Sequence, residues 1–331
     1  MKIAIDAMGS DNHPVPDVAG AVLAAREWGG EIVLVGDASV LGSELAQHDV
    51  ANLNITIKHA PEKIMMTDKP AQVVRSKRNS STHIGLGMLK SGEADGFVSA
   101  GNTGGTVSVA ALHSPRRIRG IKRFAIGARF PTPGHPLIID GGANVDCTPE
   151  QLAQFGLMGS LFMELGMQVE KPRVGLLNIG EEEGKGNALT KAAFPLLAEL
   201  PINFVGNIEP KEVMSGNVEV VVADGFAGNV FLKTAEATAR ALQKMIYQQI
   251  MGSTRTKLGG WLAQPAFDAV GNTFTPDVVG GAPLLGVNGV VIIAHGGSNP
   301  LAIKNAIGQA RMMVQGQVVD AIKAGLKEGN R

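Results

Sequence analysis

The chain has 331 residues, of which 30 are Lys or Arg and 30 are Asp or Glu, so its formal net charge is zero. This balance argues against a nucleic-acid-binding protein, which usually carries a basic excess, and the hydrophobic fraction of 44% excludes intrinsic disorder. A single cysteine cannot form an internal disulfide, so we expect a reducing, cytoplasmic location.

Short apolar runs alternate with helical patterns along most of the chain. The first run follows Met1 at once, which is typical of a strand and not of a signal peptide. Such alternation favours a mostly parallel, Rossmann-like sheet with helices on both faces, so we expect one α/β domain of αβα layers over residues 1–331. We expect strands at residues 3–5, 32–35, 55–58, 96–99, 124–128, 137–139, 174–177, 202–205, 218–222 and 290–294, and helices at 15–27, 70–77, 104–112, 149–165 and 189–199.

A helical excursion at residues 231–275 interrupts this alternation. Apolar residues from Leu232 to Ile250 recur at helical spacing, and a second helical segment follows Gly252. In one interpretation the excursion packs in the core or against a second copy of the chain. In the other it contacts a membrane surface, where tryptophan and neighbouring basic residues are favoured; the contact residues would be Leu258, Trp261 and Leu262.

Five loops rich in Gly and Asn follow strand candidates, at residues 99–105, 140–146, 178–187, 224–229 and 295–299. Ligands of open α/β sheets bind at the carboxyl ends of the strands. We therefore expect all five loops to lie along one edge of the sheet and to line one polar cleft. The residues expected to line it are Asp6, Ser99, Asp140, Asn144, Asp146, Asn178 and Gly180.

The loop at residues 99–105 opens a predicted helix. Backbone N–H groups at a helix N-terminus bind anions, and phosphate is the obvious candidate. The alternative is a plain N-capped turn. Neither the dinucleotide fingerprint nor the Walker spacing is present, so nucleotide binding has little support. The residues expected to bind phosphate are Gly101, Asn102, Thr103 and Gly104.

A basic stretch lies between His113 and Ile139, where no Asp or Glu occurs. In a chain of zero net charge this stretch creates a local positive field that attracts an acidic protein or an anionic lipid. The alternative is a solvated face that acidic residues elsewhere balance. The residues expected to dock an acidic partner are Arg116, Arg117, Arg119, Lys122 and Arg123.

Patterns for a covalent nucleophile or a metal site are missing. No Gly-x-Ser-x-Gly elbow occurs, and the histidines lack metal-ligand spacing. Neighbouring carboxylates would raise the pKa of the Cys147 thiol, which favours a small structural residue. His295 ends a strand beside two glycines and is the histidine we place in the cleft, with a structural turn as the alternative. We expect no metal and no cofactor.

Several motifs together resemble those of one family, the bacterial acyl-acyl-carrier-protein:phosphate acyltransferases (the PlsX type), over essentially the whole chain. Three loops depart from the family pattern. Ser10 stands where the family commonly has Gly, and Gly297 where it commonly has Ser. Residues 180–186 read Gly-Glu-Glu-Glu-Gly-Lys-Gly where the family commonly has Gly-Thr-Glu-Glu-Thr-Lys-Gly. The matching motifs are Ala4-Ile5-Asp6-Ala7-Met8-Gly9-Ser10-Asp11-Asn12, Lys69-Pro70, residues 99–104, Gly142-Ala143-Asn144-Val145-Asp146-Cys147, Gly175-Leu176-Leu177-Asn178-Ile179-Gly180, Asp224-Gly225-Phe226, Gly228-Asn229 and Gly280-Gly281-Ala282-Pro283-Leu284-Leu285-Gly286.

The resemblance implies that orthophosphate attacks the thioester of a fatty acyl-carrier protein and gives acyl phosphate for phospholipid synthesis. It also implies a fold similar to phosphotransacetylases and the isocitrate dehydrogenase group, a homodimer, and peripheral association with the membrane. A membrane-bound glycerol-phosphate acyltransferase would then consume the acyl phosphate.

Phosphate is an anion at pH 7, so the mechanism we expect is direct attack without a covalent enzyme intermediate. Lys185 would offset its charge, Asn229 or Asn178 would donate to the oxyanion, and His295 or Lys233 would protonate the leaving thiolate. Asp140, Asp146 and Asp224 would orient these groups. Two alternatives remain, a phosphotransacetylase that uses acyl-coenzyme A and a non-catalytic scaffold that binds acyl carrier.

Overall fold

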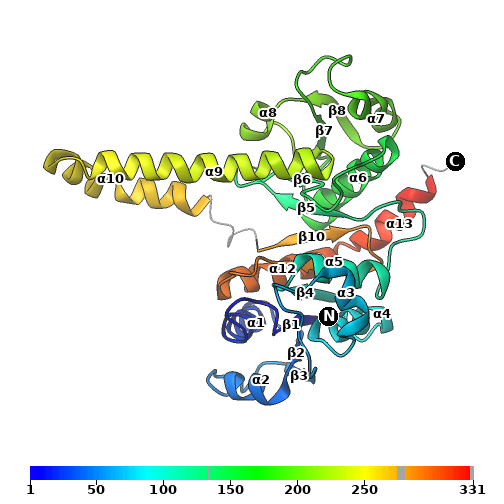
Figure 1. Ribbon diagram of the computed structural model, residues 1–331, viewed down its shortest axis with the longest axis vertical. Helices are drawn as coiled ribbons and strands as arrows, with labels where there is room; N and C mark the ends of the chain where they lie inside the picture. Colours follow the sequence, from blue (N-terminus) through cyan, green and yellow to red (C-terminus); the bar gives the residue numbers. More distant parts are fainter. Residues whose placement is uncertain (133, 274–279, 329–331) are drawn as a thin grey trace.

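The computed structural model describes residues 1–132, 134–273 and 280–328 of the chain (Figure 1). One sheet of eleven strands runs through it, in the order β3-β2-β1-β4-β11-β10-β5-β6-β9-β7-β8. The strands are β1 (Lys2–Asp6), β2 (Glu31–Gly36), β3 (Ile55–His59), β4 (Gly96–Ser99), β5 (Ala125–Arg129), β6 (Leu137–Ile139), β7 (Arg173–Leu177), β8 (Asn203–Ile208), β9 (Val220–Val222), β10 (Ala282–Leu285) and β11 (Val290–Ile293).

The strands of this sheet run in two directions. β1, β2, β3, β4 and β11 are parallel to one another, and so are β6, β7, β8 and β9. Between these sets, β10 is antiparallel to both β11 and β5, and β5 is antiparallel to β6. The two parallel sets therefore point in opposite directions. The expectation that all five loops leave one edge of the sheet is wrong for this topology.

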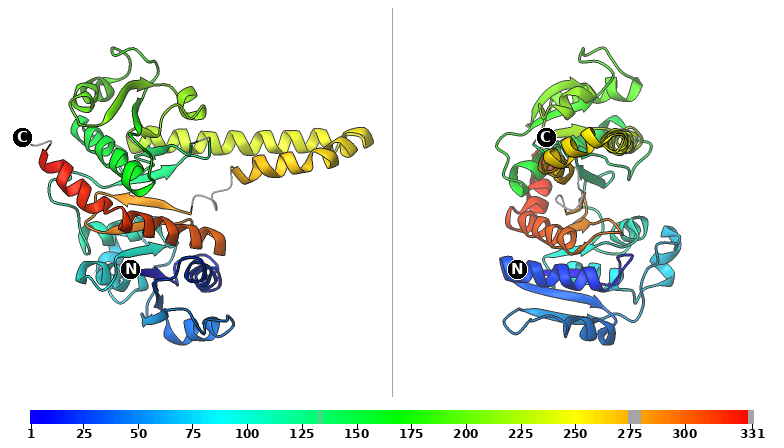
Figure 2. Two further views of the ribbon diagram at one scale, coloured as in Figure 1. Left: turned by 180° about the vertical axis from the view of Figure 1, so that it is seen from behind. Right: turned by 90° about the vertical axis from the view of Figure 1, so that its left-hand side faces the viewer.

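Helices cover both faces of the sheet, which confirms the expected layers (Figures 1 and 2). The same face of the sheet packs against α1, α12 and α13 in one half and α6 and α7 in the other. The opposite face packs against α4 and α5 in the first half and α8 and α9 in the second. The helices are α1 (Val15–Trp28), α2 (Ala38–Leu45), α3 (Pro70–Ser76), α4 (Ser81–Ser91), α5 (Thr103–Leu112), α6 (Pro149–Leu161), the π-helical turn η1 (Phe162–Gly166), α7 (Ala188–Ala198), α8 (Pro210–Met214), α9 (Gly225–Ile250), α10 (Thr254–Thr273), α12 (Pro300–Gln315) and α13 (Val318–Glu328).

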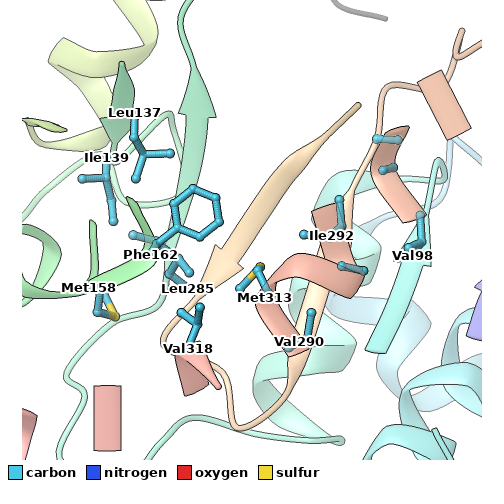
Figure 3. Close-up of a cluster of buried hydrophobic side chains, with 14 of the residues drawn as sticks. Val98, Leu137, Ile139, Met158, Phe162, Leu285, Val290, Ile292, Met313 and Val318 are labelled. Atoms are coloured by element: carbon cyan, nitrogen blue, oxygen red, sulfur yellow. The ribbon is translucent and has the colours of Figure 1, made fainter. Parts of the chain in front are cut away.

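One continuous apolar core joins the two halves. Strand residues alternate between its two faces, so that Leu34 faces one layer of helices and Val33 and Val35 face the other. Figure 3 shows where the halves meet: Leu285 of β10 and Phe162 of η1 lie between side chains of β6, β11 and α12. Because both halves share this core, the direction reversal lies inside it.

The helical excursion forms a hairpin of α9 and α10 that projects from the body of the molecule (Figures 1 and 2). Within α9 only Gly225 and Gly228 are buried, and Ile250 packs against Gly260 of α10. The start of the excursion packs against the core through Phe231, Leu232 and Ala235, and the rest of the hairpin does not. Its last two expected residues, 274 and 275, lie outside the described residues. No helix of the described chain combines the length and apolar character needed to cross a bilayer.

All of the expected strands and helices are present, with ends that differ by a few residues. Sequence reasoning missed β10, the strand that reverses the sheet. It has four residues, includes Pro283 and lacks an alternating pattern. Proline cannot donate to a ladder and argues against a central strand, so local patterns gave no signal for β10.

Candidate functional site

The polar loops form two groups because the sheet reverses at β10. The first loop group, residues 99–105 and 295–299, follows β4 and β11. The second loop group, residues 140–146, 178–187 and 224–229, follows β6, β7 and β9. Each group leaves the sheet at the carboxyl ends of its own parallel strands. The five loops therefore do not line one cleft within a single chain.

The first loop group surrounds a pocket of about 350 Å³. It lies at the N-terminus of α5, as expected for an anion site. Among the described residues, no lysine or arginine lines it. The lining residues are Asp11, Met66, Gly101, Asn102, Thr103, Gly104, His295 and Gly296.

A buried carboxylate supports the floor of this pocket. The Asp6 carboxylate accepts hydrogen bonds from the Thr82 hydroxyl at 2.7 Å and the Ser99 hydroxyl at 2.9 Å. The Ser99 hydroxyl in turn accepts one from the Gly101 N–H at 3.1 Å. Gly9 lies so close to Gly101 that a Cβ at Gly9 would be 2.8 Å from the Gly101 nitrogen. Asp6 and Ser99 therefore shape the loop, and their polar atoms are already engaged.

Asn102 caps α5 and does not point a free amide at a ligand. Its side-chain oxygen accepts from the Gly105 N–H at 2.9 Å, and its NH₂ donates to the carbonyls of Met65, Met66 and Asp68. The expectation that the Asn102 side chain binds phosphate is therefore not supported by its contacts. In the described chain the N–H groups of Thr103 and Gly104 donate to no acceptor, so they and the exposed Thr103 hydroxyl are the available donors.

His295 lies in the same pocket, as expected. Its exposed ring accepts a hydrogen bond at Nδ1 from the Gly297 N–H, at 3.1 Å. The neutral imidazole therefore carries its proton on Nε2. This tautomer can donate a hydrogen bond from Nε2 to a group bound in the pocket.

The second loop group is built on Asp140, which is fully buried. One carboxylate oxygen accepts from the N–H groups of Ile126, Gly142 and Ala143, and the other accepts from Asn144. The Asn144 amide also donates to the Phe124 carbonyl at 2.7 Å. Asp140 and Asn144 therefore hold the backbone in place. Asp146 beside them is exposed.

Asn178 has the same structural role in the loop after β7. Its amide oxygen accepts from the Ile179 N–H and its NH₂ donates to the Lys185 carbonyl. Gly180 is buried beneath the stem of Lys185, and the Lys185 side chain is exposed. Lys185 is therefore the chemically available group of that loop. Because the Asn178 amide is already hydrogen-bonded, Asn229 is favoured over Asn178 as an oxyanion donor.

The N-terminus of α9 presents the exposed amide of this group. The Asp224 carboxylate caps α9 by accepting from the Ala227 N–H at 2.7 Å. Asn229 packs on Gly142. This position requires glycine for two reasons: its φ is +134°, and a Cβ there would lie 2.8 Å from Asn229 Nδ2. One turn later, Lys233 pairs with Glu236 at 3.4 Å. Asn229 and Lys233 therefore share one face of α9.

Cys147 borders the same loops but is not an activated thiol. Burial raises the pKa of the Cys147 thiol to about 11, and the carboxylates of Asp140 and Asp224 add to the rise. The direction agrees with the sequence prediction, although burial and not Asp146 or Glu150 is the main cause. A thiol with this pKa is almost entirely protonated at pH 7, which argues against an acyl-cysteine.

The expected docking residues form an exposed basic stretch. Arg116, Arg117, Arg119, Lys122 and Arg123 are all exposed. The Arg117 guanidinium donates to the Lys122 carbonyl, and the Lys122 ammonium pairs with Glu150 at 3.3 Å. The stretch runs directly into β5 beside Asn144, so it borders the second loop group.

Sequence reasoning missed two polar clusters that depend on tertiary contacts. The Ser10 hydroxyl donates to the buried carboxyl of Asp17 at 2.5 Å, and burial raises the pKa of Asp17 to about 7. The carboxylates of Glu181, Glu209 and Glu212 converge, and Lys211 pairs with all three. That lysine neutralises much of their charge, so the cluster is explained by its own ion pairs. Local spacing gave no signal for either cluster.

Comparisons with known proteins agree on one family. The family model described as "Fatty acid synthesis protein" matches residues 1–321. A phosphate acyltransferase of Elusimicrobium minutum is 46% identical over 330 residues, which are 99% of this chain and 96% of the relative. A phosphate acyltransferase of Geobacter sp. (strain M21) is 47% identical over 308 residues, which are 93% of this chain and 87% of the relative.

Solved structures share the fold at low sequence identity. A phosphotransacetylase of Streptococcus pyogenes superposes with a TM-score of 0.61 at 18% identity, over 95% of this chain and 94% of its own. A branched-chain phosphotransacylase of Enterococcus faecalis superposes with a TM-score of 0.59 at 12% identity, over 95% and 99%. These likenesses confirm the layered α/β fold expected from the sequence.

Proposed function

The chain belongs to the fatty acid synthesis protein family, in which its relatives are phosphate acyltransferases; it is an acyltransferase, and we propose that it transfers a fatty acyl group from an acyl-carrier protein to orthophosphate. The observation that carries this proposal is the pocket of the first loop group. Two unused backbone N–H groups at the start of α5 and the Nε2–H of His295 lie around one space. The transfer needs groups that bind the phosphate anion and a hydrogen-bond donor to the leaving sulfur.

The proposed step needs no covalent enzyme intermediate. Orthophosphate is held by the N–H groups of Thr103 and Gly104, and one of its oxygens attacks the thioester carbonyl carbon. The tetrahedral oxyanion collapses and the carbon–sulfur bond breaks. The leaving thiolate takes up the proton that hydrogen phosphate loses on attack, while the Nε2–H of His295 donates a hydrogen bond to the sulfur. Acyl phosphate and free carrier thiol are the products. An acyl phosphate of this kind suits a membrane-bound glycerol-phosphate acyltransferase as its consumer.

Oxyanion stabilisation requires residues of the second loop group, which lies at the opposite end of the sheet. We assign this role to Asn229, with Lys185 offsetting the phosphate charge and Asp224 capping the helix that carries Asn229. Lys233, on the same face of α9, is the second candidate proton donor. In a two-fold dimer, the second loop group of one copy can lie next to the first loop group of the other, which brings together the two groups that are separated within one chain. The catalytic site is then shared between two copies.

The hairpin supports such a dimer because α9 carries an unpartnered apolar surface. Leu242, Met245 and Ile246 recur at helical spacing and are 52%, 61% and 45% exposed. Exposed apolar groups of this size are typical of an interface. The helix that bears Asn229 and Lys233 continues directly into this surface, so a second copy docked on α9 lies next to both residues.

The assay that tests the function follows free carrier thiol after palmitoyl-carrier protein and phosphate are added to the purified protein. We expect thiol release only when phosphate is present, with acyl phosphate trapped as its hydroxamate. Brisk turnover of acyl-coenzyme A with none of the carrier substrate would instead make the chain a phosphotransacetylase. No turnover of either substrate would indicate a non-catalytic scaffold.

The exposed basic stretch is our proposed dock for the acidic carrier. Arg119 and Arg123 make no side-chain hydrogen bond or ion pair within the described chain, so they are free for a partner. The double reversal Arg119→Glu with Arg123→Glu should raise KM for the carrier substrate about tenfold at low salt, with kcat unchanged. The same reversal at Lys58 and Lys90, in the other half of the molecule, is the control. Equal KM values for both double variants would contradict the dock.

The outer hairpin is our proposed contact with the membrane surface. Leu258, Trp261 and Leu262 are 60%, 68% and 67% exposed on α10, and Arg255 and Lys257 precede them. Trp261→Glu should lower binding to anionic lipid vesicles without changing turnover in solution, because a carboxylate is repelled from the interface. Leu23→Glu, an exposed position on α1, serves as the control. Vesicle binding equal to that of the parent protein would rule the contact out.

A further inference from the structure

Arg129, the last residue of β5, is a partly buried cation without a counter-charge. Within residues 1–132, 134–273 and 280–328 its guanidinium makes no ion pair, and its buried Nε has no hydrogen-bond partner. Burial alone lowers the pKa of Arg129. By contrast, Arg173 donates repeatedly to the carboxylate of Glu219. An unpaired buried charge is costly in free energy, so its presence calls for a ligand.

The strand register places Arg129 at the end of the sheet where the first loop group lies. β11 and β5 are both antiparallel to β10, so they run in the same direction and share that end. Ile293 pairs with Ala282, and Ile126 pairs with Leu284 two residues further along β10. By this register Arg129 is about level with Ala294, the residue before His295. Arg129 therefore lies across β10 from a pocket whose lining includes no cation.

His135 adds a second unused polar atom beside Arg129. It lies in the turn between β5 and β6, and its buried Nδ1 has no partner among the described residues. Burial lowers the pKa of His135, and the charge of Arg129 lowers it further. The ring is therefore neutral at pH 7. It offers a hydrogen bond next to the guanidinium without adding a second positive charge.

We propose that Arg129 binds the phosphate that reacts at the first loop group, with its guanidinium fork on two phosphate oxygens. This inference rests on the proposed function, to which it adds the missing cation. A guanidinium matches a phosphate bidentately, and it binds more tightly when both groups are shielded from water. The ligand chemistry is a phosphate group, either free orthophosphate or the phosphodiester of a carrier arm, and we assign the free ion.

The direct test is thermal unfolding with and without inorganic phosphate, for the parent protein, Arg129→Met and Arg129→Lys. Phosphate should raise the melting temperature of the parent, because a ligand that binds only the folded state stabilises it. Arg129→Met should melt at or above the parent temperature without phosphate, since the change removes an unpaired buried charge. Phosphate should no longer raise its melting temperature, and Arg129→Lys should respond weakly. Arg26→Met, on the exposed surface of α1, should respond like the parent.

Three results of this test would overturn the assignment. A phosphate response of Arg129→Met equal to that of the parent would exclude phosphate binding by Arg129. A melting temperature far below the parent without phosphate would show that the arginine is structural. A parent without any phosphate response would also overturn it.

Kinetics then separates the two phosphate sources. Arg129→Met should raise KM for orthophosphate at least about 30-fold and leave KM for the carrier substrate unchanged. A rise confined to the carrier substrate would overturn the assignment to free phosphate. The melting test uses phosphate alone, so a normal phosphate response with no thiol release would overturn the proposed function and leave the Arg129 site standing.

Discussion

Replacement of Asn229 by alanine is expected to lower kcat about 10²-fold, because the loss of one oxyanion donor costs that much in acyl transfer. The amide of Asn229 is exposed at the start of α9 and packs on Gly142. KM for phosphate should change little, since the amide is assigned to the tetrahedral intermediate and not to the ground state. The measurement is phosphate-dependent thiol release under saturating substrates.

A matched substitution shows whether the effect is specific. Asn217 is exposed in the turn between α8 and β9, and Asn217→Ala should keep full turnover. The unfolding temperatures of both variants should stay close to that of the parent, because neither side chain is buried. Parental kcat in Asn229→Ala would remove this residue from the reaction, and Lys185 would be the next candidate on the second loop group.

Two inactive variants should restore activity when they are mixed, if the site is shared between copies. Thr103→Glu places a carboxylate at the start of α5, where it repels phosphate in the first loop group. It should fold well, because Thr103 is exposed and helix N-termini favour negative charge. Asn229→Ala removes the donor of the second loop group. A heterodimer of the two variants contains one site with both defects and one site with neither.

Co-expression of the two variants should therefore give about one quarter of parental activity, since half of randomly formed dimers are heterodimers and each has one intact site of two. Each variant expressed alone should remain near its own low value. Co-expression of Thr103→Glu with the control Asn217→Ala should give only the activity that the unchanged first loop groups of the Asn217→Ala chains provide. Activity of the Thr103→Glu and Asn229→Ala mixture that equals the average of the two separate variants would show that each chain carries a complete site.

Local sequence patterns were sufficient to predict every described strand except β10. The strand runs, the helix after Asn102 and the helix after Asp224 are recognisable because apolar periodicity and capping act over a few residues. The motifs also identified the family, which the relatives at 46% and 47% identity confirm. The exposed hairpin was recognisable as an excursion, since its apolar residues recur at helical spacing outside the alternation of strands and helices.

The composition of the site was only partly predictable, because local patterns extend over a few residues and the contacts in the site do not. Gly and Asn loops after strands indicated where polar groups gather, but not which atoms remain free. Asn102, Asp140 and Asn178 prove to be engaged with backbone groups from distant segments, such as Met66 and Phe124. A side chain's availability depends on which backbone groups the fold brings to it, and spacing along the chain does not contain that information.

The sequence by itself therefore determined the family, the candidate loops and every described strand except β10. The tertiary structure alone decided that the loops form two groups, because the direction of β6, β7 and β9 depends on how β10 pairs with β11 and β5. It also decided that Arg129 lies partly buried at the end of the sheet that carries the first loop group, without a counter-charge among the described residues. Both properties arise from pairing between residues far apart in the chain, and such pairing is settled by the packing of the whole domain rather than by local pattern.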